Sequence, residues 1–201
     1  VDAIIPRQEL SAFIDKAHEL GFRVMLDVNP LRISEHSSLL PKMHDQLALD
    51  QLTEAPIAIK AREEKYFKLN PSFPQVRDAV AKLLRPLVED LNVDVLFLKD
   101  TAIAVNDGHG TVEGKNSAEG LVSLQRRLMS AFPKIVIAND GMNELLQPTS
   151  FISMRKPSLF RSHPISAFLF GEHVLNFFDD DSNSFKGAQS YLSSLSQQEG
   201  Q

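Results

Sequence analysis

Cysteine is absent from this sequence, and so are several other features that would point to a particular class of protein. Without cysteine the chain has no disulfides, no thiolate metal ligands and no cysteine nucleophile. No apolar run approaches the roughly 18–20 residues that span a bilayer, and the first residues lack the charged and then apolar pattern of a signal peptide. We therefore expect a soluble protein. The absence of cysteine does not distinguish the cytoplasm from the periplasm; of the two, we favour the cytoplasm.

Clusters of basic residues and recognisable cofactor motifs are missing as well. The net charge is −5, and nucleic-acid binding depends on grouped Lys and Arg side chains, so we expect no nucleic-acid partner. No His-x-x-x-His or His-Glu-x-x-His pattern occurs, and residues 108–115 do not match a phosphate-binding loop. We predict neither a metal ion nor another cofactor, and no membrane partner.

The composition is that of one globular domain. Hydrophobic residues make up 43% and charged residues 23% of 201 residues, a balance and a length that suit a single core. Residues 1–6 lead into a helix with no earlier strand for it to pack against. We therefore expect residues 1–201 to form a single domain cut from a longer protein, with a polar, Ser- and Gln-rich tail at residues 182–201.

Helix-like and strand-like segments alternate three times along the chain. In residues 8–20 the apolar side chains follow the i, i+3, i+4, i+7 spacing of an amphipathic helix, and Gly21 is placed to end it. A buried strand is expected directly after, in residues 22–28. The same order recurs in residues 73–90 and 93–98, and again in residues 118–132 and 134–138. Three such units predict parallel strands joined by helical crossovers.

The predicted fold is α/β, a parallel-stranded (β/α) barrel of TIM type that is present only in part. About three to five parallel strands are indicated, whereas a closed barrel of this type has eight. Weaker patterns indicate a helix near residues 39–52, short strands at 57–60 and 66–69, apolar runs at 151–154, 165–170 and 174–178, and a helix around 187–195.

Polar side chains follow each of the three predicted strands. They are Asp27 and Asn29 at the end of the first strand, Lys99, Asp100 and Thr101 after the second, and Asn139, Asp140 and Glu144 after the third. The side chains that do chemistry in parallel α/β folds lie at the carboxyl ends of the strands, so these groups are candidates for an active site. Asp and Asn are also common in turns and as helix N-caps, which is the structural alternative for each of them.

Two stretches resemble a known enzyme family. Residues 20–29, Leu-Gly-Phe-Arg-Val-Met-Leu-Asp-Val-Asn, are similar to the helix, glycine, strand and Asp-x-Asn opening of α-amylase-like and α-galactosidase-like barrel glycosidases. Residues 69–74, Leu-Asn-Pro-Ser-Phe-Pro, with the helix and strand that follow, resemble the stretch that leads to the family's nucleophile. The likeness covers about residues 10–144. It implies a barrel that cleaves glycosidic bonds with a pair of carboxylates.

The sequence departs from this family pattern in two places. Leu98 is followed by Lys99 where the family has its catalytic Asp, and Asp100 comes one place later. A shift of one residue along a strand turns a side chain to the other face, so Asp100 is expected to point away from the site unless a bulge restores its direction. In addition, Asn139-Asp140-Gly141 replaces the family's Glu in a Gly-Glu-Gly-like turn. An altered or inactive site is therefore one alternative.

We predict a glycoside hydrolase that acts on a carbohydrate, with Asp100 as nucleophile or stabiliser and Asp140 or Glu144 as acid/base. The residues expected to contact the sugar are Asp27, Asn29, Lys99, Asn106, Asn139 and His173. One alternative is a catalytically inactive barrel domain that binds carbohydrate or supports a larger protein. Another is a Schiff-base lyase, which would need a desolvated Lys99 amine. We interpret residues 106–110, Asn-Asp-Gly-His-Gly, as a plain turn, and no pattern indicates an oligomeric state.

Overall fold

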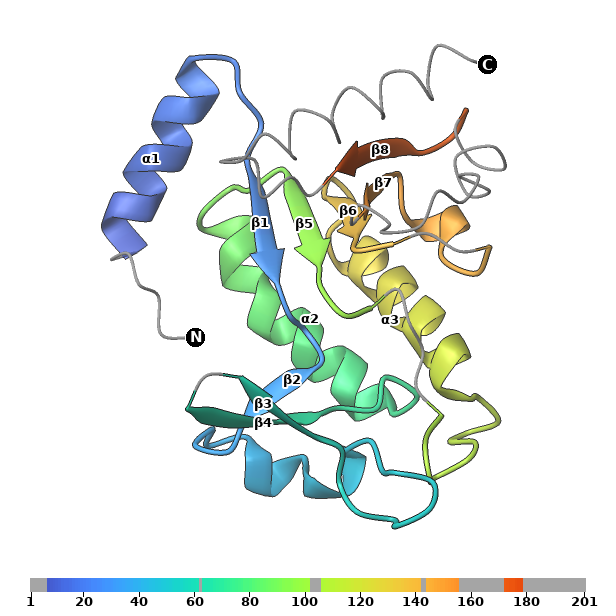
Figure 1. Ribbon diagram of the computed structural model, residues 1–201. Coiled ribbons are helices and arrows are strands. Elements are labelled where there is room, and N and C mark those ends of the chain that lie inside the picture. The colour runs from blue at the N-terminus through green and yellow to red at the C-terminus, as the bar shows by residue number, and fades with distance from the viewer. Residues whose placement is uncertain (1–6, 62, 102–105, 142–143, 156–171, 179–201) are drawn as a thin grey trace, which may run out of the picture.

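The computed structural model of the chain describes residues 7–61, 63–101, 106–141, 144–155 and 172–178 (Figure 1). Its helices are α1 (Arg7–Glu19), α2 (Pro74–Glu89) and α3 (Ser117–Ala131), with short 3₁₀ turns η1 (Leu40–Lys42), η2 (His44–Gln46) and η3 (Gln147–Thr149). Its strands are β1 (Met25–Val28), β2 (Arg32–Ser34), β3 (Ala58–Ala61), β4 (Glu64–Lys68), β5 (Val95–Leu98), β6 (Val136–Asn139), β7 (Ile152–Arg155) and β8 (Leu175–Phe178).

Two sheets organise these elements. The larger sheet has the order β1-β5-β6-β7-β8, and every neighbouring pair in it is parallel. The smaller sheet, in the order β2-β4-β3, is antiparallel and lies beyond the arrowhead ends of β1 and β5 (Figure 1). The predicted parallel arrangement of the three helix-to-strand units is confirmed. The segment between the first two units, residues 29–72, contains the small sheet and is called the excursion below.

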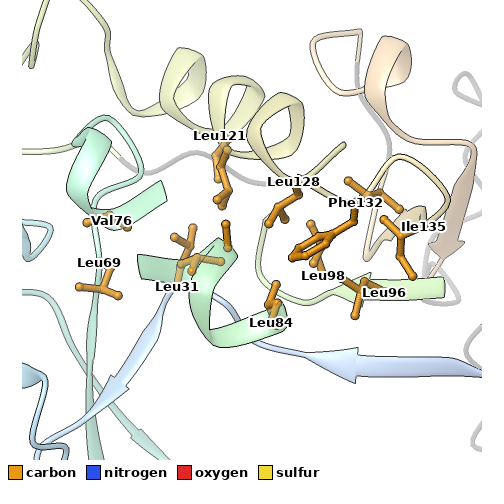
Figure 2. Packing of buried hydrophobic residues seen from close by; sticks show 14 of the residues in the cluster. Leu31, Leu69, Val76, Leu84, Leu96, Leu98, Leu121, Leu128, Phe132 and Ile135 are labelled. Carbon is orange, nitrogen blue, oxygen red and sulfur yellow. The ribbon is translucent and has the colours of Figure 1, made fainter. Parts of the chain in front are cut away.

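The main core lies between the larger sheet and the helices α2 and α3. The fully or almost fully buried side chains shared by these elements include Val76, Val80, Leu84, Leu96, Leu98, Leu121, Leu124, Leu128 and Ile137, part of which Figure 2 shows. On the helices they recur at the spacing that keeps one face inward, and on β5 they alternate as a pleated strand requires. Burial of this apolar surface, at about 25 cal/mol per Å², fixes the position of the strands.

Alternation along the strands sends the remaining side chains to the opposite face of the sheet. Leu96 and Leu98 belong to the core cluster on the helix side, whereas Phe97 between them does not. The register pairs Asp27 with Phe97 and Leu98 with Asn139, so Asp27 shares the face of Phe97 and Asn139 shares that of Leu98. The strand-end residues are thereby divided between two faces.

Two predictions for the excursion have different outcomes. The strands expected at residues 57–60 and 66–69 are confirmed as β3 and β4; β3 begins and ends one residue later than expected, and β4 begins two residues earlier and ends one residue earlier. The helix expected near residues 39–52 is wrong: the chain forms η1 and η2, and then Leu47 and Leu49 make isolated β-bridges to Leu69 and Pro56. The backbone amide of Ala48 donates to Lys68 O at 2.7 Å, so contacts distant in sequence replace the local hydrogen bonds of a helix.

The apolar runs at 151–154 and 174–178 coincide with β7 and β8, each to within one residue. The apolar run 165–170, the helix expected at 187–195 and the tail at 182–201 lie outside the described residues. Within the described ranges, no helix combines the length and apolar character needed to traverse a bilayer.

Gly120 allows α3 to approach the loop that precedes α2. A Cβ at this position would lie 2.5 Å from Ser72 N and 2.8 Å from Pro71 C, closer than real contacts permit. The same junction carries a hydrogen bond from Ser72 Oγ to Asn116 O at 2.9 Å, and a capping box between Asn116 and Glu119 starts the helix. The backbone at residues 70–72 is therefore held directly against the first turn of α3.

Replacing Gly120 with alanine should destabilise the protein by about 1–3 kcal/mol, because the added methyl group forces two backbones apart. Urea unfolding of Gly120→Ala beside Ser130→Ala, an exposed position on the same helix, measures the effect. An unchanged midpoint in Gly120→Ala would contradict this account of the packing.

Asp94 ties α1 and β1 to the start of β5. Its Oδ2 accepts hydrogen bonds from His18 Nε2 and Val24 N, both at 2.8 Å, and its Oδ1 accepts one from Arg23 Nη1 at 2.9 Å. Burial acts to raise the pKa of Asp94, but the hydrogen bonds from Val24, His18 and Arg23 together outweigh it, so the pKa lies below its ordinary value of 3.8. The folded state therefore favours the charged carboxylate.

The stabilisation from Asp94 should depend on pH with a definite sign. Because its pKa is lower in the folded state, the contribution is present in full above the unfolded-state value of 3.8 and is lost as the pH falls through the folded-state value. At pH 7, Asp94→Asn should lose about 1–3 kcal/mol of unfolding free energy, and the gap to wild type should narrow in acid. Urea titrations from pH 3 to pH 7 test this, with the exposed Asp15→Asn as control; a gap independent of pH would refute it.

Candidate active site at the carboxyl ends of the strands

The carboxyl ends of β1, β5 and β6 lie side by side because the three strands are parallel and in register. We call the residues that follow these ends, together with Arg32 and Lys68 of the small sheet, the rim. Asn29 follows β1, Lys99 and Asp100 follow β5, and Asp140 follows β6. The small sheet lies next to these ends and adds side chains from β2 and β4 (Figure 1).

Asp100 contacts three other residues of the rim, namely Asn29, Arg32 and Asp140. Asn29 Nδ2 donates to its Oδ2 at 2.6 Å, and Arg32 Nη2 forms an ion pair with the same oxygen. The backbone of Asp100 has a φ of +57°, in the left-handed region that Asp visits more readily than most residues. This turn directs the side chain of Asp100 toward Asn29 and Arg32, so no bulge is required to change its direction.

One oxygen of the Asp100 carboxylate remains open. The side chain is 41% exposed, and within the described part of the chain no donor contacts Oδ1. Two donors thus fix the orientation of the carboxylate through Oδ2, while Oδ1 is available to another molecule.

Asp140 lies next to Asp100. Its Oδ2 accepts a hydrogen bond from the backbone N–H of Asp100 at 2.7 Å, and the residue is half-buried. The structure therefore brings together two of the three carboxylates predicted to be catalytic, from the ends of neighbouring strands.

Lys99 and Asp27 form a separate pair. Lys99 Nζ makes an ion pair with Asp27 Oδ2, and the two side chains are 50% and 49% exposed. They lie on the sheet face that carries Phe97, away from the helices. A salt-bridged, half-exposed lysine differs from the desolvated amine that Schiff-base chemistry requires.

Asn139 lies beneath the rim in a buried polar layer. Its Oδ1 accepts hydrogen bonds from Thr101 Oγ1 and Gln125 Nε2, both at 2.8 Å, and Thr149 Oγ1 donates to Gln125 Oε1 at 2.5 Å. All four residues are at most 3% exposed. Asn139 therefore has no surface at which a substrate could bind, and it connects the end of β5 to the end of β6 through Thr101.

The other predicted site residues lie apart from Asp100 and Asp140. Glu144 and His173 are exposed, and the structure describes no contact between either of them and Asp100. Asn106 is exposed and lines a small recess of about 250 Å³ with Gln51 and Asn116.

Residues 106–110 contain a turn, and the buried Asp107 holds this segment in place. Its carboxylate accepts hydrogen bonds from the backbone amides of Leu49 and His109, at 3.3 Å and 2.8 Å, and from His109 Nδ1 at 2.6 Å. These bonds attach the segment to the excursion near β3, which agrees with its interpretation as a structural turn.

Arg32 and Lys68 were not predicted from the sequence. They are paired directly opposite each other on β2 and β4, and Arg32 contacts Asp100. Burial lowers the pKa of Lys68; the nearby Asp100 and Asp140 act to raise it, and Arg32 acts to lower it further. In the sequence, Arg32 lies shortly after residues 20–29 and Lys68 lies directly before residues 69–74, the two stretches that resemble the glycosidase family. That position is the only signal that points to them.

A larger hollow, of about 690 Å³, lies at the opposite end of the strands. It is lined by residues that precede β5 and β6, among them Asp94, Phe132 and Lys134. It therefore shares no residue with the rim. Within the described residues, no group of three or more His, Cys, Asp or Glu side chains is arranged to hold a metal ion.

Comparison with known proteins gives matches only among solved structures. Neither a family model nor a curated protein sequence matches the chain. The α-galactosidase TtGalA from Thermus thermophilus, in complex with stachyose, is 14% identical with a TM-score of 0.56 over 84% of this chain and 36% of its own. The noncanonic maltogenic α-amylase AmyB from Thermotoga neapolitana is 14% identical with a TM-score of 0.55 over 76% of this chain and 32% of its own.

An α-amylase from Lactobacillus plantarum, 15% identical with a TM-score of 0.53, adds a third barrel enzyme, matched over 73% of this chain and 35% of its own. The chain has the fold of part of a glycoside hydrolase barrel. The predicted fold class is thus confirmed, and the chain spans about a third of the length of these structures. At these identities the likeness concerns the fold alone.

The buried layer under the rim of this partial barrel should contribute to stability. Gln125→Leu removes both hydrogen bonds of the Gln125 side chain, so that Asn139 Oδ1 keeps only its bond from Thr101 and Thr149 Oγ1 only its bond to Leu146 O, which should cost about 1–3 kcal/mol. Thermal or urea unfolding measures this, with Arg126→Leu at the exposed neighbouring position as the matched control. Equal stability of the two variants would show that the layer contributes nothing.

Proposed function

We propose that the rim binds a carbohydrate and hydrolyses a glycosidic bond, with Asp100 and Asp140 as the two carboxylates. The single observation that carries this proposal is the arrangement of Asp100: one oxygen is held by Asn29 and Arg32, the other has no donor among the described residues, and Asp140 lies beside it. Glycoside hydrolysis uses a pair of carboxyl groups on either side of the scissile bond. The position at the carboxyl end of barrel strands supports the same assignment.

Asp100 is proposed as the nucleophile or electrostatic stabiliser. A carboxylate in this role must be ionised and held in one orientation, because small misplacements of a reacting group are costly. Asn29 and Arg32 supply that orientation through Oδ2. Oδ1 is then the atom that faces the anomeric carbon.

Asp140 is proposed as the acid/base residue, with Glu144 as the alternative. Asp140 is supported by its contact with the backbone of Asp100, whereas Glu144 is exposed. In this role the Asp140 carboxyl group would exchange the proton with the leaving oxygen. Asn29, which contacts Asp100, is proposed to bind the sugar beside it, and Asp27 and Lys99 are proposed to bind it from the ends of β1 and β5.

The other predicted sugar contacts take different places in this proposal. Asn106 and His173 would meet only more distant parts of a ligand, and Asn139 is assigned a positioning role because it is buried. Carbohydrate binding without turnover is the second candidate. The observation that favours it is the hydrogen bond that engages Asp140 with the protein's own backbone. The salt bridge of Lys99 with Asp27 lends no support to the lyase alternative.

Hydrolysis should depend on both carboxylates of the rim. Asp100→Asn and Asp140→Asn should each lower kcat/KM by about a hundredfold or more, because each removes a charge or a proton donor at the reacting centre. Release of p-nitrophenol from a panel of p-nitrophenyl α- and β-glycosides of glucose and galactose measures this, with the exposed Asp45→Asn as control.

Three results distinguish the candidates. Turnover that falls in both rim variants and not in Asp45→Asn supports hydrolysis at this site. Saturable binding by calorimetry without turnover supports the second candidate. Equal activity in wild type and both rim variants, or neither binding nor turnover on the whole panel, rejects the proposal.

A further inference from the structure

Arg32 and Lys68 place two positive charges on one face of the small sheet. They are directly opposite each other in the antiparallel pair of β2 and β4, and residues so paired point to the same side with Cβ atoms about 4.5–5.5 Å apart. Ile33 and Phe67, the next pair in the register, point the other way and pack on the main core. Since Arg32 reaches Asp100, the face that carries Lys68 is turned toward the rim.

Like charges placed directly across a strand pair destabilise a sheet. Only one of these two cations is paired: Arg32 forms its ion pair with Asp100, whereas no described residue makes a hydrogen bond or ion pair with Lys68 Nζ. Lys68 is nevertheless half-buried, and an ammonium group removed from water without a partner costs free energy. Asp100 and Asp140 attract this charge and offset part of that cost, but burial outweighs them, so the pKa of Lys68 stays below its ordinary value.

The charges around Lys68 balance when it is protonated. Arg32 and Lys68 carry two positive charges, and Asp100 and Asp140, which both interact electrostatically with Lys68, carry two negative ones. The pair of Lys99 and Asp27 is balanced by itself. A charged ligand would disturb this balance, whereas an uncharged polyol would not.

Two further polar atoms at this place lack partners among the described residues. Asn29 Oδ1 and Arg32 Nε are buried without a hydrogen bond, although both side chains hold Asp100 through their other atoms. Unpaired groups of this kind are infrequent in proteins, and a catalytic role or an additional binding partner is one explanation for them. The other two among the described residues, Asn139 Nδ2 and Ser153 Oγ, lie below the strand ends. Arg32 is paired with Lys68 across β2 and β4, and Asn29 and Arg32 both contact Asp100, so the unpaired atoms of Asn29 and Arg32 lie at the same part of the rim as Lys68.

We propose that Lys68 is a substrate-binding residue whose ammonium donates hydrogen bonds to hydroxyl oxygens of an uncharged sugar held against Asp100. This inference rests on the proposed function and names the substrate class for it. A hydroxyl can accept from Lys68 and donate to a carboxylate oxygen such as Asp100 Oδ1, so adjacent hydroxyls of one pyranose ring satisfy both groups. The Lys68 ammonium, which has no hydrogen-bond partner among the described residues, then acquires one upon binding.

The role of Lys68 predicts opposite effects on binding and on stability. In Lys68→Met, KM for the best p-nitrophenyl glycoside of the panel should rise about tenfold or more, because a hydrogen bond from a charged donor is lost. The unfolding free energy should stay equal or increase, since the substitution removes an unpaired ammonium and its repulsion of Arg32. A merely structural lysine would give the reverse pattern on stability.

The matched control is Lys65→Met, the same substitution on the same strand at an exposed position whose ammonium lies over the ring of Phe67. Lys68→Arg, which keeps the charge, should recover part of the affinity. The inference is overturned if Lys68→Met and Lys65→Met have the same KM, or if Lys68→Met loses stability in step with activity. Calorimetry with D-galactose and D-galacturonate adds the test of class: tighter binding of the anionic sugar would overturn the assignment of an uncharged one.

The two proposals fail in different ways. If the wild type turns over or binds a glycoside and Lys68→Met behaves like Lys65→Met, the inference on Lys68 falls and the proposed function stands. If the wild type neither binds nor hydrolyses any member of the panel, the proposed function falls, and the inference falls with it.

Discussion

The contact of Asp100 with Asn29 and Arg32 is the interaction on which the candidate site depends. It joins three parts of the chain: the end of β1, the first strand of the small sheet, and the end of β5. Asp100 reaches these partners only because its backbone adopts a left-handed conformation, which a non-glycine residue accepts at some cost in free energy. The amide of Asp100 is in turn held by Asp140, so the turn, both carboxylates and the arginine constrain one another.

The residues that stabilise the fold and those proposed to bind a ligand lie in different places: the first below the ends of the strands, the second at those ends. On the helix side an apolar core and the buried layer of Thr101, Gln125, Asn139 and Thr149 fix where the strands end. Beyond the strand ends the small sheet supplies the two cations that face the carboxylates. Among the described residues, two of the four buried side-chain atoms without a hydrogen bond, Asn29 Oδ1 and Arg32 Nε, lie at the rim, and the other two, Asn139 Nδ2 and Ser153 Oγ, lie below it on paired positions of β6 and β7. The apolar core and the buried layer below the rim form a rigid support for a binding site at the strand ends.

Sequence patterns predicted the three helix-to-strand units because each helix shows an apolar face at regular spacing and each strand is a short apolar run. They failed in residues 39–52, where the apolar spacing is helical but Leu47 and Leu49 pair with residues far along the chain. Asp100 was predicted as a site residue, yet its direction depends on a backbone angle that no local motif encodes. Arg32 and Lys68 were not predicted because the register of β2 and β4 brings them opposite each other, and the sequences of two short strands do not indicate that register.

The most direct test of the central claim is a crystal structure of the protein soaked with p-nitrophenyl α-D-galactopyranoside, in the Asp100→Asn variant to prevent turnover. The account predicts a sugar ring within hydrogen-bonding distance of residue 100 and of the Lys68 ammonium, at the carboxyl ends of β1, β5 and β6. A sugar bound instead in the hollow beside Asp94, or a rim that stays without sugar at saturating concentration, would contradict it.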